Sequence, residues 1–264
     1  MAMYNAPGVY IKDLTSGAQS ITQASSSVGL LIGKTRSGKI NEAQKVGSWT
    51  EFINKYANGL DTPFMENDYL AYAVHGFFTN GGSQLYIGSV KKNAVKAQAV
   101  SEKNGITIVA ANEGEWGNKL KVTISKSSDW EDGEYEAYDV RADLGSTDTA
   151  VVTDLTLKDL PTLVKNSKMR MWIGEFTVPD TVTTITPEEV TLAGGTEGDE
   201  LSNYDYEQAL EMAKTLDDLT MIAIPGQTSK VLNASLMAFC DNNGYFPFLD
   251  MPMGSLPEEA RQYR

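Results

Sequence analysis

The sequence predicts an α/β (α+β) core built on a mixed sheet, interrupted by an inserted, mainly antiparallel β domain and preceded by an extended N-terminal arm. Three observations predict this. An apolar run at 28–33 and a strand–helix–strand pattern at 219–250 are typical of buried α/β strands. The block at 105–193 alternates apolar and polar residues, as half-buried antiparallel strands do. Segment 7–13 is extended but has almost no local partner.

These patterns divide the chain into four expected parts. The arm and its linker occupy 1–27, the first part of the core 28–104, the inserted β domain 105–193, and the second part of the core 194–264. A strand that leaves its own domain needs partners for its backbone donors and acceptors, and a neighbouring subunit's sheet would supply them. The expected inter-subunit arm consists of Pro7, Gly8, Val9, Tyr10 and Ile11.

The first part of the core begins with the strand at 28–33. Ser48 and Glu51 form a capping-box pattern that opens a short helix through Tyr56. A second helix is expected at 67–80, ended by two glycines, followed by a strand at 84–90.

The inserted block contains four expected strands, separated by turn residues, at 106–109, 120–124, 135–141 and 151–157. Its most distinctive motif is a tryptophan set between glycines and followed by asparagine, which predicts a tight structural corner. The corner residues are Gly114, Trp116, Gly117 and Asn118.

The second part of the core follows a glycine-rich junction at 194–198. It is expected to contain a helix at 204–216, a strand at 219–224, a helix at 230–242 stopped by Gly244, and a final strand at 245–250. The last three elements form a βαβ unit, whose two strands run parallel.

Composition excludes several classes of function. The chain has 264 residues and a formal net charge of −13, which disfavours binding to nucleic acid through phosphate neutralisation. A single cysteine, Cys240, and a single histidine, His75, rule out an internal disulfide and a metal site rich in these residues. With neither a signal segment nor an apolar run of membrane-spanning length, we expect a cytoplasmic protein and no direct membrane insertion.

Residues 33–39 match a phosphate-binding loop as far as its lysine. Ile40 then stands where the magnesium-binding hydroxyl belongs, and no helix pattern follows directly. The segment is therefore interpreted as a glycine-bounded surface turn. His75 has no partner that the sequence can name, and Cys240 lies in an apolar helix pattern. We expect no catalytic, cofactor-binding or metal-binding residues.

Together these segments resemble the contractile tail sheath family of bacteriophages, R-type bacteriocins and related contractile injection systems. The resemblance rests on motifs in the same order along the chain: the arm, the first core strand and turn at 28–38, 49–52 (W-x-E-F), 77–82 (F-F-x-N-G-G), the corner at 114–118, and the junction at 192–198.

The resemblance implies a structural subunit rather than an enzyme. It implies stacked hexameric rings of the chain itself around an inner tail tube protein, with baseplate and tail terminator proteins as further partners. It also implies assembly in the bacterial cytoplasm into a virion tail or phage-tail-like particle. Family members usually continue into a C-terminal domain, so we expect either a fragment or a departure from the family at Arg264.

Two other functions stay open. A monomeric surface or receptor-binding module could use the β domain without needing the arm. A nucleotide-binding enzyme could use residues 33–39 and would show stabilisation by nucleotide.

Overall fold

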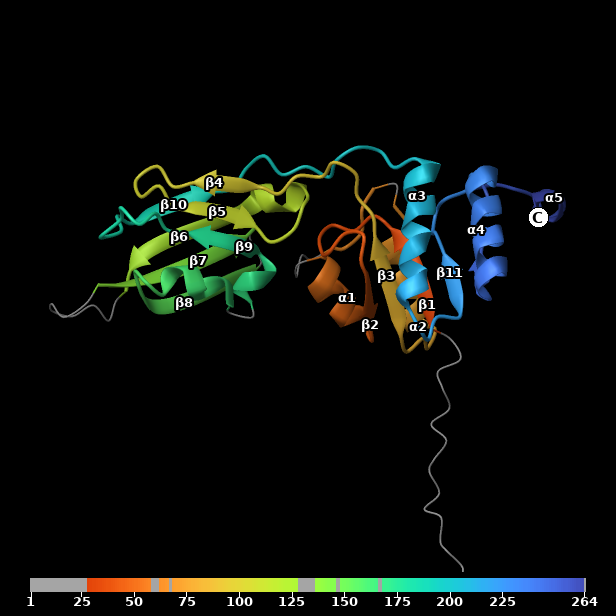
Figure 1. Cartoon of the computed structure of the whole chain (residues 1–264), viewed down its shortest axis with the longest axis horizontal. Coiled ribbons are helices and arrows are strands. Elements are labelled where there is room, and N and C mark those ends of the chain that lie inside the picture. The colour runs from red at the N-terminus through yellow and green to blue at the C-terminus, as the bar shows by residue number, and fades with distance from the viewer. Residues whose placement is uncertain are drawn as a thin grey trace, which may run out of the picture.

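The computed structural model describes residues 28–57, 62–66, 68–127, 136–145, 148–165 and 168–263. The expected arm from Pro7 to Ile11 lies outside these residues. Figure 1 shows two bodies side by side, an α/β body and a β-rich body, joined by two chain segments. The predicted α/β core with a mixed sheet, and the separate antiparallel sheets, are confirmed.

The α/β body is built on a five-stranded sheet in which four strands are parallel and one edge strand is antiparallel. The strand order is β12-β11-β1-β3-β2. Gly29 pairs with Leu85 on one side and with Met221 on the other. The strands are β1 (Gly29–Gly33), β2 (Ala43–Val46), β3 (Leu85–Ser89), β11 (Met221–Ala223) and β12 (Phe246–Phe248).

Helices cover both faces of this sheet because its strands are apolar on both faces. Leu30 packs into a cluster with α3, η4 and α4, whereas Leu31 packs against the opposite cluster with α1 and α2. The helices are α1 (Trp49–Tyr56), α2 (Leu70–Thr79), α3 (Asn203–Ala209), the 3₁₀ helix η4 (Leu210–Thr215), α4 (Lys230–Asn243) and α5 (Pro257–Tyr263).

The helix ends differ from expectation in detail. Ser48 caps α1 by accepting from the Glu51 amide at 3.1 Å, but the Glu51 carboxylate accepts from Gly47 N, one residue earlier than a capping box requires. Helix α2 begins at Leu70, whose amide donates to Asp68 Oδ1 at 2.9 Å. The expected helix at 204–216 is α-helical only to Ala209 and then becomes the 3₁₀ helix η4.

The end of the α/β body agrees with the sequence. Gly244 ends α4 in the left-handed conformation (φ 76°). Strands β11 and β12 run parallel on either side of α4, which confirms the predicted βαβ unit.

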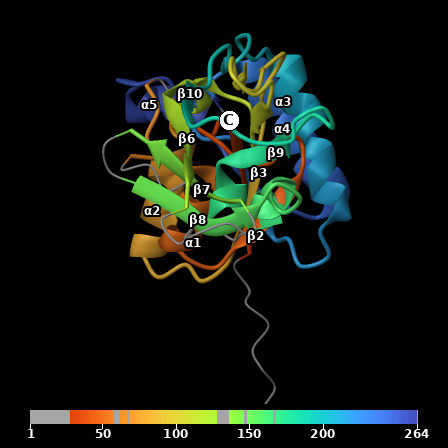
Figure 2. The same cartoon turned by 90° about the vertical axis from the view of Figure 1, so that its left-hand side faces the viewer.

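The β-rich body contains a four-stranded sheet, β10-β6-β7-β8, and a three-stranded sheet, β4-β5-β9. Figure 2 views this body from the front. Its elements are β4 (Gln98–Val100), β5 (Thr107–Ala110), η1 (Glu115–Lys119), β6 (Leu120–Lys126), β7 (Ala137–Leu144), β8 (Asp148–Thr156), η2 (Leu160–Lys165), η3 (Met169–Met171), β9 (Ile173–Thr177) and β10 (Glu188–Thr191).

A single apolar cluster fills the β-rich body, with Trp172 and Tyr138 among its largest members. Strand β4 precedes residue 105 and pairs with β5, so the sheets of this body begin before the expected start of the inserted domain. The division of the chain into four parts stays a prediction. Within the part of the chain that the structure describes, no helix is long and apolar enough to cross a membrane.

Candidate functional site

The phosphate-loop-like segment forms a packed turn that leads from β1 into strand β2 rather than into a helix. Thr35 Oγ1 donates to Ser37 O at 2.8 Å and lies 2.5 Å from Ser89 Oγ. Gly38 has φ 99°, and a Cβ there would lie 2.6 Å from the Tyr56 ring. Without a helix start, this turn lacks the array of backbone N–H groups that binds a phosphate.

Doubly wound sheets usually bind ligands in a crevice at the carboxyl ends of two neighbouring strands. The connections that follow these two strands run in opposite directions. Here these strands are β1 and β11. A Cβ added at Gly226, just after β11, would lie 2.3 Å from Tyr69 Cδ2, so the Tyr69 ring packs directly on this backbone. The Tyr69 side chain therefore covers the backbone that follows β11.

Asp68 stands at the same end of the sheet. Burial raises the pKa of its carboxyl group, while hydrogen bonds from the amides of Leu70 and Lys34 act in the opposite direction. Oδ1 thus accepts from the first residue of α2 and Oδ2 from the turn after β1, so this carboxylate has a structural use.

The single cysteine and the single histidine both pack against other side chains. Burial raises the pKa of the Cys240 thiol to about 11, which makes it a poor nucleophile at neutral pH. The His75 ring lies edge-on to Trp49, with 4.9 Å between ring centroids. Among the described ranges, no group of three or more His, Cys, Asp or Glu side chains is placed to hold a metal ion.

The predicted corner lies where the β-rich body meets the α/β body. Gly114 has φ 135°, and a Cβ there would lie 2.9 Å from Arg36 O. Trp116 is 3% exposed and belongs to the apolar cluster of the β-rich body. Asn118 exchanges two hydrogen bonds with the backbone of Gly195, at 2.9 and 2.7 Å. A Cβ on Gly117 would lie 2.7 Å from Ala97 Cβ.

One buried lysine, Lys91, also lies where the two bodies meet, and no sequence pattern indicates its burial. The side chain of Lys91 is 1% exposed, and its ammonium group donates to Arg36 O at 3.2 Å, Glu113 O at 3.0 Å and Glu197 Oε2 at 2.7 Å. Glu197 also accepts from the Glu115 amide at 3.1 Å. The Val90–Lys92 sequence looks like an ordinary strand end, so only long-range contacts reveal this burial.

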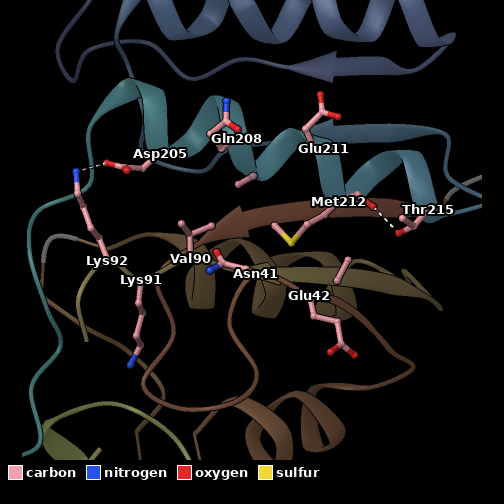
Figure 3. Close-up of a pocket in the computed structure, with 12 residues that line it drawn as sticks. Asn41, Glu42, Val90, Lys91, Lys92, Asp205, Gln208, Glu211, Met212 and Thr215 are labelled. Carbon is pink, nitrogen blue, oxygen red and sulfur yellow. Dashed lines mark hydrogen bonds and ion pairs between the residues drawn. The ribbon is translucent and has the colours of Figure 1, made fainter. Parts of the chain in front are cut away.

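A groove of about 600 Å³ lies on the other side of the same chain segment, between the start of β2 and α3–η4. Figure 3 shows Val90 and Met212 pointing into it, while Lys91 points away and Lys92 reaches Asp205 at 3.2 Å. A Cβ on Gly88 would lie 2.8 Å from Met212 Cε, so this glycine makes room for the methionine.

The charges on the rim of the groove are paired. Lys39 lies 3.2 Å from Glu42 Oε1, and its hydrogen bond, followed by that of Gln44, lowers the pKa of Glu42. Lys214 lies 2.7 Å from Glu211 Oε2. An apolar floor and paired rim charges suit contact with another polypeptide.

Solved structures share this fold, among them two sheath tail proteins. A sheath tail protein from Listeria innocua has a TM-score of 0.62 at 18% sequence identity, covering 81% of this chain and 44% of that chain. A sheath tail protein from Desulfitobacterium hafniense has a TM-score of 0.61 at 19% identity, covering 92% and 52%. This chain therefore spans about half the length of these proteins. No protein-family model and no curated protein sequence matches it.

Proposed function

We propose that this chain belongs to a structural subunit of a contractile tail sheath, which polymerises around an inner tube and contracts to drive the tube through a target cell envelope. The observation that carries the proposal is the fold that this chain shares with two sheath tail proteins over 81% and 92% of its length. The order of sequence motifs supports the same assignment.

Exposed apolar residues on the α/β body support an assembling protein. The rings of Phe246 and Phe248 on edge strand β12 contact each other and are 62% and 52% exposed. Met253 and Leu256, a few residues further on, are 91% and 64% exposed. Large exposed apolar side chains close together on a surface are typical of contacts between proteins.

The proposed assembly joins subunits through the arm at residues 7–11. Four or five strand hydrogen bonds of about 0.5–1.5 kcal/mol each would give a link of a few kcal/mol. Such links allow rigid subunits to rotate against one another while remaining connected. The proposed partners are copies of the chain in hexameric rings, an inner tube protein, and baseplate and tail terminator proteins, in a phage tail or a phage-tail-like particle.

The experiment that tests this proposal is negative-stain electron microscopy of the whole gene product, purified without denaturant, beside a variant lacking residues 1–20. We expect hollow striated tubes from the first and dispersed, folded particles from the second. Tubes of normal appearance from the deletion would contradict the role of the arm, and dispersed particles from both would contradict the sheath assignment.

A thermal-shift scan with ATP-Mg²⁺ and GTP-Mg²⁺ on the same preparation addresses the enzyme alternative. No shift is expected, because the turn at 33–39 leads into a strand. Saturable stabilisation by either nucleotide would favour the enzyme.

A further inference from the structure

The two bodies have separate apolar cores. Among the described residues, the cluster of the β-rich body shares no member with the two clusters of the α/β body. Two parts of a chain move relative to each other by default unless a large apolar interface fixes them. The orientation of the β-rich body therefore has to come from something other than a shared core.

Two chain segments connect the bodies, and they hydrogen-bond to each other. Val95 N donates to Thr196 O at 3.2 Å, and Thr196 N donates to Val95 O at 3.1 Å. Asp199 N donates to Lys92 O at 2.8 Å. This pairing makes the connection a narrow two-stranded ribbon. A ribbon of this kind resists stretching but leaves bending and twisting open.

Lys91 stands where this ribbon leaves the α/β body and holds three separate segments. Arg36 lies in the turn after β1, Glu113 in the loop that precedes the corner of the β-rich body, and Glu197 in the returning strand of the ribbon. Because the Lys91 side chain is only 1% exposed, bulk water has little access with which to replace these acceptors. A buried ammonium group requires all of its hydrogen bonds, so the three segments are held in one geometry.

Close backbone approaches around Lys91 reinforce that geometry. A Cβ on Gly198 would lie 2.0 Å from Lys92 O, and a Cβ on Gly114 would lie 2.8 Å from Glu197 Oε1. These glycines let the returning strand and the corner come close enough for one lysine to reach acceptors on both.

We propose that Lys91 is a positioning residue that locks the β-rich body in a fixed orientation on the α/β body, with Glu197 as its charged partner. All of these contacts lie within one chain, and the proposed role of Lys91 goes beyond the sheath assignment. Breaking these contacts leaves both bodies folded on their own cores and frees the β-rich body to swing on its two-stranded ribbon.

The neighbouring lysine provides a matched control. The side chain of Lys92 is 43% exposed and pairs with Asp205 of α3, within the α/β body. Lys91→Met and Lys92→Met each remove one positive charge, at neighbouring positions. Only the Lys91 side chain contacts a segment of the β-rich body.

The test is the distribution of distances between two nitroxide labels, measured by pulsed electron paramagnetic resonance on the full chain. One label is placed at Thr153→Cys on β8 and the other at Val231→Cys on α4, both exposed, in a Cys240→Ala background. We expect one narrow distribution in the parent and in Lys92→Met, and at least a twofold broader one in Lys91→Met, with unchanged far-ultraviolet circular dichroism.

Glu197→Gln provides a second, gentler variant. It keeps an oxygen acceptor but deprives Lys91 of its carboxylate partner, and we expect the distribution to broaden here as well. If Lys91→Met does not fold, Glu197→Gln decides the question. A parent-like distance distribution in the folded variants would contradict the proposed role of Lys91. Equal broadening in Lys92→Met would contradict it as well. Because the measurement needs no polymer, it stands apart from the test of sheath assembly.

Discussion

The α/β body and the β-rich body bury their apolar residues in different ways. Strands β1 and β3 of the α/β body send side chains to two clusters, so that Leu30 and Leu31 are both covered, from opposite faces. Strands of the β-rich body have one buried face, as in β6, where Leu120, Val122 and Ile124 are buried and Lys121 is exposed. The first arrangement relies on helices to cover the sheet, whereas the second places two sheets around one core.

Polar contacts between distant residues hold turns in both bodies. In the α/β body, Thr35 of the turn after β1 contacts Ser89. In the β-rich body, Glu188 of β10 accepts from the amides of Glu102 and Lys103 and from Asn104 Nδ2. Because their apolar cores are separate, the two bodies are expected to behave as separate cooperative units.

The largest expected effect on stability comes from removing one buried leucine side chain from each body. Leu30→Ala and Leu120→Ala each remove a fully buried side chain, at an expected cost of about 2–5 kcal/mol. Native-state hydrogen exchange should show Leu120→Ala lowering protection in β5–β9 and Leu30→Ala lowering it in β1, β3 and β11. Val151→Ala, at a position 52% exposed, is the control. If either variant lowered protection equally in both bodies, the two bodies would be one cooperative unit.

An intermediate effect is expected at Glu188, and it depends on pH. Partial burial alone would raise the pKa of Glu188, but hydrogen bonds, the largest from Ser101, lower it below its usual value. The resulting stabilisation is present above the unfolded-state pKa of about 4.3 and is lost as the pH falls through the lowered folded-state value. We expect Glu188→Gln to cost about 1 kcal/mol at pH 7.

Urea unfolding at pH 7 and at about pH 3 measures this effect, because the difference from the parent should shrink at the lower pH. Glu189→Gln is the matched control, since Glu189 makes only an exposed contact with Lys121 at 3.4 Å. A cost at Glu188 that does not change with pH would assign its role to packing instead of charge.

The smallest expected effect is local to the α/β body. Ser48→Ala removes the acceptor for the Glu51 amide and should cost about 1 kcal/mol in the unfolding of that body alone. Ser83→Ala, also exposed, is the control. Thermal unfolding followed by circular dichroism measures both. A loss in Ser83→Ala as large as in Ser48→Ala would show that the cap contributes nothing specific.

Elements with strong local signals could be predicted from the sequence. The apolar runs of β1 and β3 and the glycine that ends α4 are local features, and the structure has all three. Short strands without such signals were missed, namely β2, β4, β9 and β10. In β2, for example, Ala43–Val46 is mostly half-buried, and its pairing with β3 depends on residues some 40 positions away.

The place where the two bodies meet was not predicted from the sequence. The glycine and asparagine spacing predicted only a structural corner at 114–118, because these residues favour turn conformations. The burial of Lys91 could not be predicted, because a lysine next to another lysine is ordinarily solvated. Its partner Glu197 also lies 106 residues further along the chain. Burial of a charge is decided by tertiary contacts, which composition and spacing do not reveal.

The two-stranded ribbon also bears on how the β-rich body could be exchanged. Its outgoing and returning strands meet as paired residues, Val95 and Thr196, and such pairs lie about 5 Å apart. The chain therefore leaves the α/β body and returns to it at nearly the same point. Another domain whose own ends lie equally close could replace the β-rich body there, while the strands of the α/β sheet keep their connections.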